Sequence, residues 1–344
     1  MSIIVGMSGG VDSAVSAALL KELGEQVIGV TLHFSQTSSC CDVGSVRRAK
    51  AQCEQLGIAW HEVDMQDVFR CQVIEPFWEA MKRGTTPNPC IFCNESVKWR
   101  GLLNVAEELH VDLIASGHYA GIVRSADGVQ ICRGVDRTKD QSYFLYRLSA
   151  EERNRILFPL AGRLKSEVVA LAPKWFSADL LARHESQDLC FVEGSIHDEV
   201  SRHLSDLPGD IVLLDGTKVG RHHGLASYTI GQRSGLGVSA SSRLYVVMKR
   251  QETNELVLGQ RSDCLRTFFE ATDLKWQHIP TSAMSSFSAD VVARYRSKPV
   301  RATIHRIAED KVCISLEEAI FAVTPGQAVV FYHDQCILGG GTIV

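Results

Sequence analysis

The feature that most constrains the fold is a glycine-rich turn between an apolar strand and a helix at the start of the chain. Ile3-Ile4-Val5 has the pattern of a short buried strand, and residues 13–23 form a helical run that ends before Gly24. The turn between them consists of Gly6, Met7, Ser8, Gly9, Gly10, Val11, Asp12 and Ser13. Its backbone N–H groups can surround a polyanion at the helix N-terminus. A phosphate site is therefore the direct interpretation, and a glycine-rich turn without a ligand is the alternative.

The turn is neither of two common nucleotide-binding motifs. It lacks the Gly-Lys-Ser/Thr ending of a Walker A loop, and a Rossmann Gly-x-Gly-x-x-Gly does not fit it. Asp12 is a candidate for Mg²⁺ binding or loop geometry, with a helix cap as the alternative role. The turn alone indicates phosphate binding and leaves the substrate open.

Strand and helix patterns alternate through the first half of the chain. Strands are predicted at 27–32, 59–63 and 112–116, and helices at 45–56, 68–83 and 95–109. This order favours an α/β fold with a doubly wound parallel sheet. A hairpin at 120–133 turns at Asp127-Gly128, and helical segments continue to about residue 182.

The pattern changes after Cys190. Glycines separate short alternating runs between 208 and 260, which predicts a small β-rich domain. Further strands are predicted at 290–295, 300–307, 312–316, 328–332 and 336–344, a spacing typical of a barrel. We therefore predict domains at 1–193, 194–262 and 263–344.

The net charge of the chain excludes a protein that binds nucleic acid through a uniformly basic surface. The 344 residues include 36 Lys and Arg against 40 Asp and Glu, a net charge of −4. Two stretches nevertheless lack acidic residues between their ends: Asp215 to Glu252 and Asp290 to Glu309. Basic side chains there fit local RNA phosphate contacts, or simply a solvated face. No apolar run predicts a membrane span and no leader pattern begins the chain, so we expect a cytoplasmic protein.

Three of the eleven cysteines stand in patterns that indicate chemistry. Cys90 and Cys93 follow Thr86-Pro87-Asn88-Pro89, and Cys190 lies much further along the chain. Such a pair can be redox-active, half of a zinc site or half of an iron–sulfur site. A closed structural zinc site is disfavoured because there is no second Cys-x-x-Cys. We predict reduced packing residues at Cys53, Cys71, Cys132, Cys264, Cys313 and Cys336, and assign no role to Cys40 and Cys41.

Several long motifs, in one order, resemble the tRNA-specific 2-thiouridylase (MnmA) family of the PP-loop ATP pyrophosphatase superfamily. The resemblance runs from Ile4 to the end of the chain. The motifs are Ser8 to Ser13, Thr86 to Asn94, Ser116 to Ala120, Lys139 to Leu145, Tyr228 to Gly237, Arg294-Tyr295, Thr324 to Gln327, and Leu338 to Gly341.

The resemblance implies ATP-dependent 2-thiolation of the wobble uridine, uridine 34, in tRNAs for Lys, Glu and Gln. The uracil 2-oxygen would be adenylated, with ATP and Mg²⁺ as cofactors, and sulfur would then replace it. Cys93 would be the nucleophile, and Cys190 would carry sulfur as a persulfide. The implied partners are tRNA and a sulfur-donor protein, a cysteine desulfurase or sulfur relay protein, with no DNA and no membrane.

The resemblance also implies the other site residues. ATP would contact Gly6 to Ser13, Leu32 and Gly117. The target base would contact Asn88, Pro89 and Cys90, and other parts of the tRNA would contact His118, Lys139, Asp140, Gln141, Arg294, Tyr295 and Gln327. A satisfied structural histidine is the alternative for His118.

The chain departs from the family pattern at two positions. Cys90 stands where many members have Asp, and Asp188 where many have Gly. With the first departure, Cys90, Cys93 and Cys190 would supply three thiolates to a 4Fe–4S cluster. Cluster chemistry and metal-free persulfide chemistry both stay open. The competing functions are a PP-loop synthetase that adenylates a small molecule and a non-enzymatic, metal-clipped RNA-binding protein.

Overall fold

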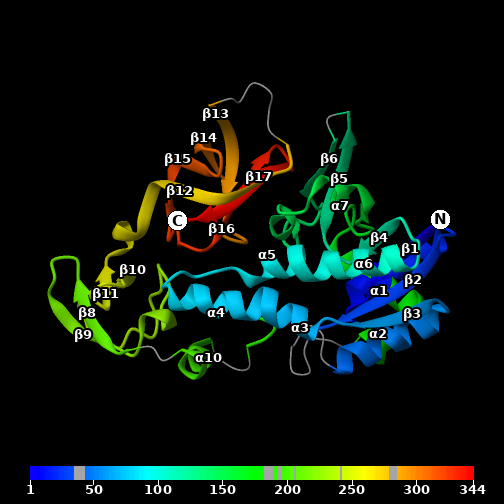
Figure 1. Cartoon of the computed structure of the whole chain (residues 1–344), viewed down its shortest axis with the longest axis horizontal. Helices are drawn as coiled ribbons and strands as arrows, with labels where there is room; N and C mark the ends of the chain where they lie inside the picture. Colours follow the sequence, from blue (N-terminus) through cyan, green and yellow to red (C-terminus); the bar gives the residue numbers. More distant parts are fainter. Residues whose placement is uncertain are drawn as a thin grey trace.

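The computed structural model divides into an α/β layer, a small sheet and a β-barrel (Figure 1). The structure describes residues 1–34, 43–126, 128–181, 189–192, 196–204, 207–240, 242–278 and 285–344. Cys40, Cys41, Asp127 and Asp188 lie outside the described residues. None of the helices formed by the described residues combines the length and apolar character needed to cross a membrane.

A five-stranded parallel sheet forms the centre of the first domain. Its order is β3-β2-β1-β4-β7, with bounds Ala59–Asp64, Gln26–His33, Ser2–Gly6, Leu113–Ser116 and Ile156–Leu157. Alternate residues of β1 face two different cores, Ile4 in one and Ile3 with Val5 in the other. A sheet buried on both faces is the arrangement of doubly wound α/β folds, so the predicted fold class is confirmed.

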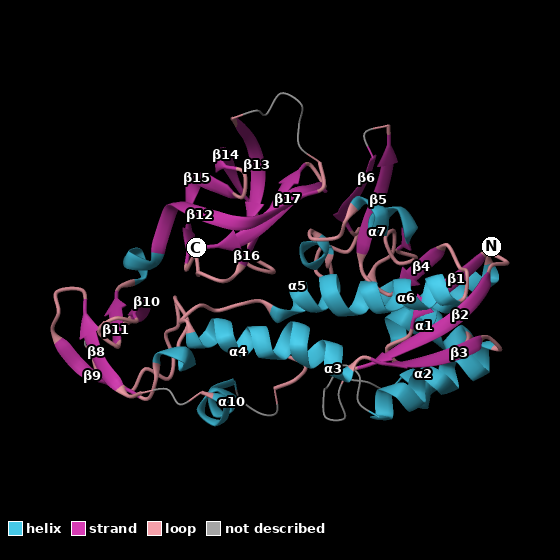
Figure 2. Cartoon of the chain, viewed as in Figure 1, coloured by secondary structure: helices cyan, strands magenta, loops and turns pink. Residues whose placement is uncertain are grey.

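Helices cover this sheet and continue past it (Figure 2). They are α1 Val11–Glu22, α2 Val43–Leu56, α3 Gln66–Phe69, α4 Glu75–Lys82, α5 Pro89–Cys93, α6 Arg100–Glu108, α7 Ala150–Arg155, α8 Lys165–Leu171, α9 Ala178–Leu181 and α10 Ile196–His203. Two of the predicted helices are interrupted by π-helical turns, Arg70–Ile74 between α3 and α4 and Asn94–Trp99 between α5 and α6. Such turns occur frequently at functional sites.

The helical segment that carries Cys90 and Cys93 begins earlier than predicted. The prediction began this helix at Glu95, whereas α5 begins at Pro89. Asn88 is its N-cap residue, and the Asn88 side chain accepts a hydrogen bond of 3.2 Å from the Cys90 N–H. Pro89 suits the first helical position because its missing N–H is not needed there. Both cysteines therefore lie within the first five residues of a helical segment.

The small central sheet has the order β10-β11-β8-β9, with bounds Tyr245–Arg250, Glu255–Gly259, Gly209–Leu213 and Lys218–His222. It buries its own core, which includes Ile211, Val246 and Leu258. This confirms the predicted β-rich central domain. A separate cluster connects it to the first domain, because Phe77 and Met81 of α4 pack with Val200 of α10 and Ala226.

The last domain is a closed six-stranded barrel. Its strands are β12 Leu265–Trp276, β13 Ser286–Val292, β14 Val300–Ala308, β15 Lys311–Phe321, β16 Ala328–His333 and β17 Cys336–Ile343, and β12 pairs with β17 to close it. The predicted barrel is confirmed, although β12 was not among the predicted strands. The first four residues of β12 are exposed. Its sequence also lacks the regular alternation of apolar and polar residues by which a strand is recognised.

The barrel and the first domain share a sheet and a core. The hairpin of β5 Ala120–Ser125 and β6 Gly128–Arg133 extends the barrel sheet through β17. Tyr332 and Ile337 of the barrel are buried in the same cluster as Trp99 and Tyr146 of the first domain. The position of the barrel is therefore set by burial of apolar side chains from both domains.

Two predictions about cysteines were wrong. Cys132 of β6 and Cys336 of β17 face each other across the strand pair with Cα atoms 3.9 Å apart, and they form a disulfide. Sequence spacing does not show that a hairpin of one domain pairs with the last strand of another, so the prediction of reduced packing residues at both positions fails. Cys71 is exposed rather than packed, whereas Cys53 and Cys264 are buried.

Arg147 adds a polar connection between the two domains. Its side chain is 8% exposed, and Nε lies 2.5 Å from a Glu95 carboxylate oxygen. Its terminal nitrogens lie 2.6 Å and 3.2 Å from the two carboxylate oxygens of Asp273 in β12. Glu95 follows directly after the segment that holds Cys93 and Asn94. Arg147 therefore ties that segment to the barrel.

We expect Arg147→Met to lower the free energy of unfolding of the full chain by about 2 kcal/mol, because two carboxylates would lose a buried cationic partner. Urea denaturation followed by tryptophan fluorescence measures this change. Arg70→Met is the matched control, because Arg70 pairs with Asp67 and Glu75 on the surface and should change stability by less than about 0.5 kcal/mol. Equal effects of the two substitutions would contradict the proposed connection.

Candidate active site

The predicted ATP residues lie at one edge of the parallel sheet. Gly6 at the end of β1 is in register with Val30 of β2 and with Ser116 at the end of β4. The loops that follow these strands therefore leave the sheet on the same side. Ligands of open α/β sheets bind at this carboxyl edge.

The phosphate-loop candidate is held by its own hydrogen bonds. The Ser8 N–H donates to Ser13 Oγ at 3.2 Å, and the Ser13 hydroxyl donates to the Gly10 carbonyl at 3.1 Å. Gly9 has φ +71° and lies so close to α2 that a Cβ would be 2.4 Å from the Ser45 carbonyl oxygen. Only glycine fits this position, so the loop's conformation is specified by the sequence.

Gly117 and Leu32 approach the same region from neighbouring strands. A Cβ on Gly117 would lie 2.6 Å from the Ser13 backbone nitrogen and 2.7 Å from the Asp12 carbonyl carbon. The absent side chain allows the end of β4 to pass directly beside the start of α1. Leu32, 6% exposed, is buried at the end of β2 and packs over Gly101.

Asp12 makes contacts that the sequence did not predict. The N-cap of α1 is Gly10, so Asp12 is not the capping residue. Its carboxylate oxygens each lie 2.7 Å from Lys165 Nζ, and one also accepts a hydrogen bond of 2.9 Å from the Tyr119 hydroxyl. No motif pointed to Lys165, because it lies far from Asp12 in sequence and enters from α8.

The two predicted catalytic cysteines contact one hydrophobic core. Cys93 is 6% exposed and belongs to this core, whereas Cys90, three residues earlier, is exposed. Asn94 fixes the turn between them, because its side-chain amide donates to the Cys90 carbonyl at 2.8 Å. Cys190 is half-buried and packs against the same core from a distant part of the chain.

Phe191 anchors the segment that carries Cys190. The centre of its ring lies 5.2 Å from that of Phe77 and 6.1 Å from that of Phe69, both in edge-to-face geometry. Such aromatic contacts add to the free energy gained by burial. Nothing in the sequence showed which rings Phe191 would contact.

The predicted metal ligands do not form a metal site in the part of the chain that the structure describes. Within those residues, no three His, Cys, Asp or Glu side chains gather in a way that could hold a metal ion. The described residues therefore lend no support to a cluster at Cys90, Cys93 and Cys190, which stays a prediction, and we derive no reaction step through one.

Asp140 and Gln141 organise a loop beside the site. Asp140 is 9% exposed and accepts hydrogen bonds from the Gly134 N–H at 3.0 Å, the Ser142 N–H at 3.2 Å and the Ser142 hydroxyl at 2.9 Å. Burial raises the pKa of Asp140, against the opposing effect of these bonds. Gln141 accepts a bond of 3.0 Å from the Tyr119 N–H. Contact of either residue with tRNA stays a prediction.

His118 lies between aromatic rings rather than on an open surface. Its ring centre is 5.5 Å from that of Trp99 and 6.4 Å from that of Phe158, and its Nδ1 is 2.8 Å from the Ser116 hydroxyl. Burial, with a smaller effect of the positive charge of Lys98, lowers the pKa of His118 to about 3. The imidazole is therefore neutral at pH 7 and offers a hydrogen bond rather than a charge.

The predicted RNA residues of the barrel lie near those of the first domain. Tyr295 is within 4.3 Å of Phe144 and 5.9 Å of Tyr143, measured between ring centres. The Tyr143 hydroxyl donates to the Ala328 carbonyl at 2.8 Å. These contacts connect the Lys139–Leu145 motif with the Arg294-Tyr295 motif, which lies in the barrel.

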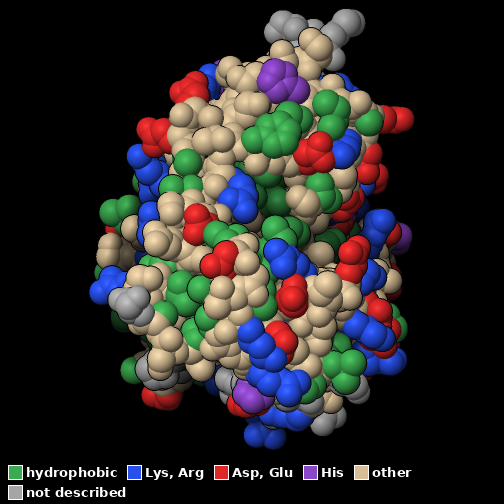
Figure 3. Space-filling view, turned by 90° about the vertical axis from the view of Figure 1, so that its left-hand side faces the viewer, with side chains coloured by type: hydrophobic (Ala, Val, Ile, Leu, Met, Phe, Trp, Pro, Cys, Tyr) green, Lys and Arg blue, Asp and Glu red, His purple; other side chains and the backbone are tan. Residues whose placement is uncertain are grey.

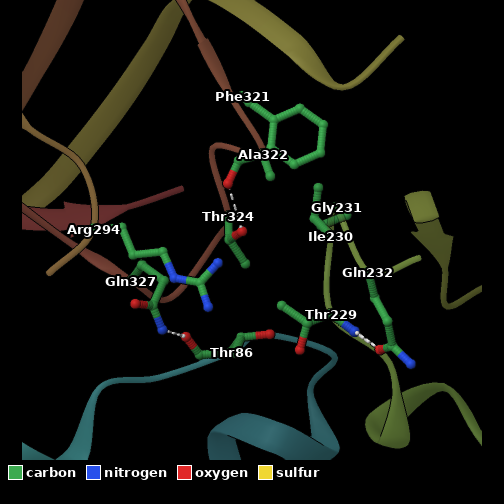
Figure 4. A pocket seen from close by; sticks show the side chains of 10 residues that line it. All are labelled: Thr86, Thr229, Ile230, Gly231, Gln232, Arg294, Phe321, Ala322, Thr324 and Gln327. Atoms are coloured by element: carbon green, nitrogen blue, oxygen red, sulfur yellow. Dashed lines mark hydrogen bonds between the residues drawn. The ribbon is translucent and has the colours of Figure 1, made fainter. Parts of the chain in front are cut away.

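A cavity of about 310 Å³ opens where all three domains meet. Figure 4 shows Thr86 from the first domain, Thr229 and Gln232 from the central domain, and Arg294 and Gln327 from the barrel around it. The Gln327 side chain donates to the Thr86 carbonyl at 2.7 Å. Thr229 and Gln232 belong to the Tyr228–Gly237 motif, to which the sequence assigned no role. Phe321, which supplies an aromatic ring, lies outside all the motifs of the sequence analysis.

The surface charge is mixed rather than uniformly basic. Figure 3 shows lysine and arginine side chains over much of one face, with acidic groups among them and more basic groups toward its lower part. Asp210 partly neutralises the first acid-free stretch, because it lies 2.7 Å from Lys218 Nζ. Arg294, by contrast, is exposed at the cavity.

Three family profiles match successive parts of the chain. They are described as a tRNA methyl transferase HUP domain over residues 1–194, a tRNA methyl transferase PRC-barrel domain over 197–260, and an aminomethyltransferase beta-barrel domain over 266–343. Together they account for nearly the whole chain.

Individual proteins are similar over the full length. The chain is 41% identical to the tRNA-specific 2-thiouridylase MnmA of Geobacter metallireducens, covering 99% of this chain and 96% of that protein. It is 40% identical to the MnmA of Gloeothece citriformis, covering 99% of each. A structure of the U34-tRNA thiolase NcsA from Methanococcus maripaludis with its 4Fe–4S cluster matches 59% of this chain and 67% of that chain, at 19% identity and a TM-score of 0.37. A similarity of this size supports no inference about a cluster here.

We expect Gly117→Ala to weaken ATP binding at least about 10-fold, because the added methyl group would displace the backbone of Asp12 and Ser13. Titration calorimetry with a non-hydrolysable ATP analogue measures the affinity. Gly162→Ala is the control, since a Cβ there meets no atom within 4 Å. Unchanged affinity in a folded Gly117→Ala protein would contradict the assignment of this loop.

Proposed function

Because the chain belongs to the tRNA-specific 2-thiouridylase MnmA family, we propose that it thiolates carbon 2 of the wobble uridine in tRNAs for Lys, Glu and Gln, using ATP. The observation that carries this proposal is the combination of a preformed phosphate loop with two cysteines, Cys93 and Cys190, on one core. The loop supports ATP binding, and the cysteines support sulfur transfer.

The first step activates a poor leaving group. The uracil 2-oxygen attacks the α-phosphorus of ATP, a P–O bond to pyrophosphate breaks, and the uridine becomes O-adenylated. The loop N–H groups and the N-terminus of α1 stabilise the phosphate charge. Asp12 is the carboxylate in the loop that would hold Mg²⁺, which would supply positive charge to the phosphates.

The second step exchanges oxygen for sulfur. The terminal sulfur of a Cys190 persulfide adds to carbon 2, and the Cys93 thiolate then attacks the Cys190 sulfur. The S–S bond of the persulfide breaks, its electron pair stays with the terminal sulfur, and AMP leaves as the thiocarbonyl forms. A Cys93–Cys190 disulfide remains, which an external dithiol must reduce before the next cycle.

The RNA would approach from the side where the barrel meets the first domain. Arg294 supplies an exposed cation there, and Tyr295 supplies an aromatic ring. Phosphate contacts position an RNA, and aromatic side chains stack on unpaired bases. Asn88 caps the helix of Cys93, so a base at Asn88, Pro89 and Cys90 would lie beside that helix. We propose the three-domain cavity as part of this surface.

The proposal includes a protein that supplies sulfur. Cys190 must receive a sulfur atom in each cycle, and a cysteine desulfurase or relay protein is the class of donor that forms persulfides. We propose that the protein meets tRNA and the sulfur donor in the cytoplasm.

The test combines ATP cleavage with analysis of the RNA. With tRNA, Mg²⁺ and a persulfide donor, a cysteine desulfurase supplied with cysteine, we expect the protein to convert ATP to AMP and to form 2-thiouridine. Cys93→Ser and Cys190→Ser should lower 2-thiouridine formation at least about 100-fold, since each removes a thiol that the reaction consumes. Cys264→Ser, at a buried cysteine outside the site, should retain activity.

Two outcomes would contradict the proposed function. AMP formation that is indifferent to tRNA would favour a synthetase for a small molecule. RNA binding without any ATP cleavage would favour a non-enzymatic RNA-binding protein. Mass spectrometry of nucleosides from the treated tRNA identifies the product in the remaining case.

A further inference from the structure

The Asp12–Lys165 pair lies at the end of the phosphate-loop candidate, where α1 begins. Lys165 Nζ lies 2.7 Å from each carboxylate oxygen of Asp12, and the two side chains are 17% and 30% exposed, Lys165 being the less exposed. Asp12 is next to Ser13, whose hydroxyl closes the loop through Ser8 and Gly10. The ammonium group therefore lies beside the residues that close the loop.

The loop needs a cation that its own residues do not supply. Residues 6–13 contain no Lys or Arg, and their one ionisable side chain is the carboxylate of Asp12. A triphosphate carries several negative charges, so an unpaired Asp12 would repel it. Lysine is a common phosphate ligand in nucleotide sites, where it acts as a compact point charge with three donors.

The structure positions Lys165 independently of Asp12. The Lys165 backbone N–H donates to an Asp136 carboxylate oxygen at 2.9 Å, and Asp136 also accepts from the Thr138 hydroxyl at 2.7 Å. Asp12 in turn keeps a second partner, the buried Tyr119. Lys165 can therefore turn from Asp12 toward a phosphate without leaving either residue unanchored.

We propose that Lys165 is an ATP-binding residue, one that neutralises Asp12 before the nucleotide enters and binds the triphosphate once it has entered. The proposal rests on the proposed function, because it takes ATP as the co-substrate. It explains why a carboxylate is compatible with this phosphate site, and it leaves Asp12 accessible to Mg²⁺ once ATP is bound.

A double-mutant cycle separates this role from that of a merely structural ion pair. The variants are Lys165→Met, Asp12→Asn and the double substitution, and the measured quantity is the affinity for a non-hydrolysable ATP analogue, with AMP as the second ligand. We expect Lys165→Met to weaken binding of the analogue about 10-fold or more in the otherwise unaltered chain. We expect the same weakening in the Asp12→Asn background. The affinity for AMP should change less than about 2-fold. Recovery of unaltered affinity in the double variant would overturn the proposal, because it would mean that Lys165 only neutralises Asp12.

Control variants exclude a loss of folding. Lys174 also pairs with α1, because its Nζ lies 2.5 Å from a carboxylate oxygen of Glu22. Lys174→Met should leave the affinity for the analogue unchanged. Lys165→Arg keeps the charge and should stay within about 3-fold of the unaltered protein. Equal weakening by Lys174→Met, or equal binding by Lys165→Met and the unaltered chain, would also overturn the proposal.

The same titrations distinguish the two levels of failure. If the unaltered chain binds the analogue and Lys165→Met binds it equally well, the role of Lys165 fails and the proposed function stands. If the unaltered chain binds no ATP analogue, both fail.

Discussion

The contact between the barrel and the helix that holds Cys93 is the constraint on which the rest of the site depends. Arg147 joins Glu95, two residues after Cys93, to Asp273 of the barrel, and the two domains also share an apolar core. The barrel therefore cannot shift without disturbing the cysteine helix. As a consequence, Arg294 and Tyr295 occupy fixed positions relative to Asn88 and Cys93. Residues far apart in sequence thus form one surface beside a thiol.

The phosphate loop shows how local charge is balanced in a protein of net charge −4. Glycine at positions 9 and 117 lets backbone segments pass within contact distance, which places N–H groups rather than side chains around the site. The carboxylate of Asp12 would oppose phosphate binding, but Lys165 neutralises it from a separate helix. We propose that phosphate binding here depends on backbone donors and on this cation from a separate helix.

The fold was largely predictable because its signals are local. The alternation of strands and helices, the loop after β1 and the barrel strands after residue 285 follow from short-range patterns of apolar residues and glycines. The contacts that complete the site are not local. Lys165 beside Asp12, Phe191 against Phe77, and Cys132 bonded to Cys336 each require a tertiary arrangement that periodicity does not encode. The start of α5 was missed for another reason, since the prolines before Cys90 indicate a break although Pro89 begins the helix.

The most direct test of the account is the redox state of two cysteines after one round of thiolation. The protein would be loaded with persulfide sulfur, supplied with ATP and tRNA in the absence of a reductant, and digested for mass spectrometry of its peptides. The Cys132–Cys336 linkage serves as an internal reference that is present before and after the reaction. We expect a Cys93–Cys190 linked peptide to appear in proportion to 2-thiouridine. Formation of 2-thiouridine with Cys93 and Cys190 both recovered as thiols would contradict it.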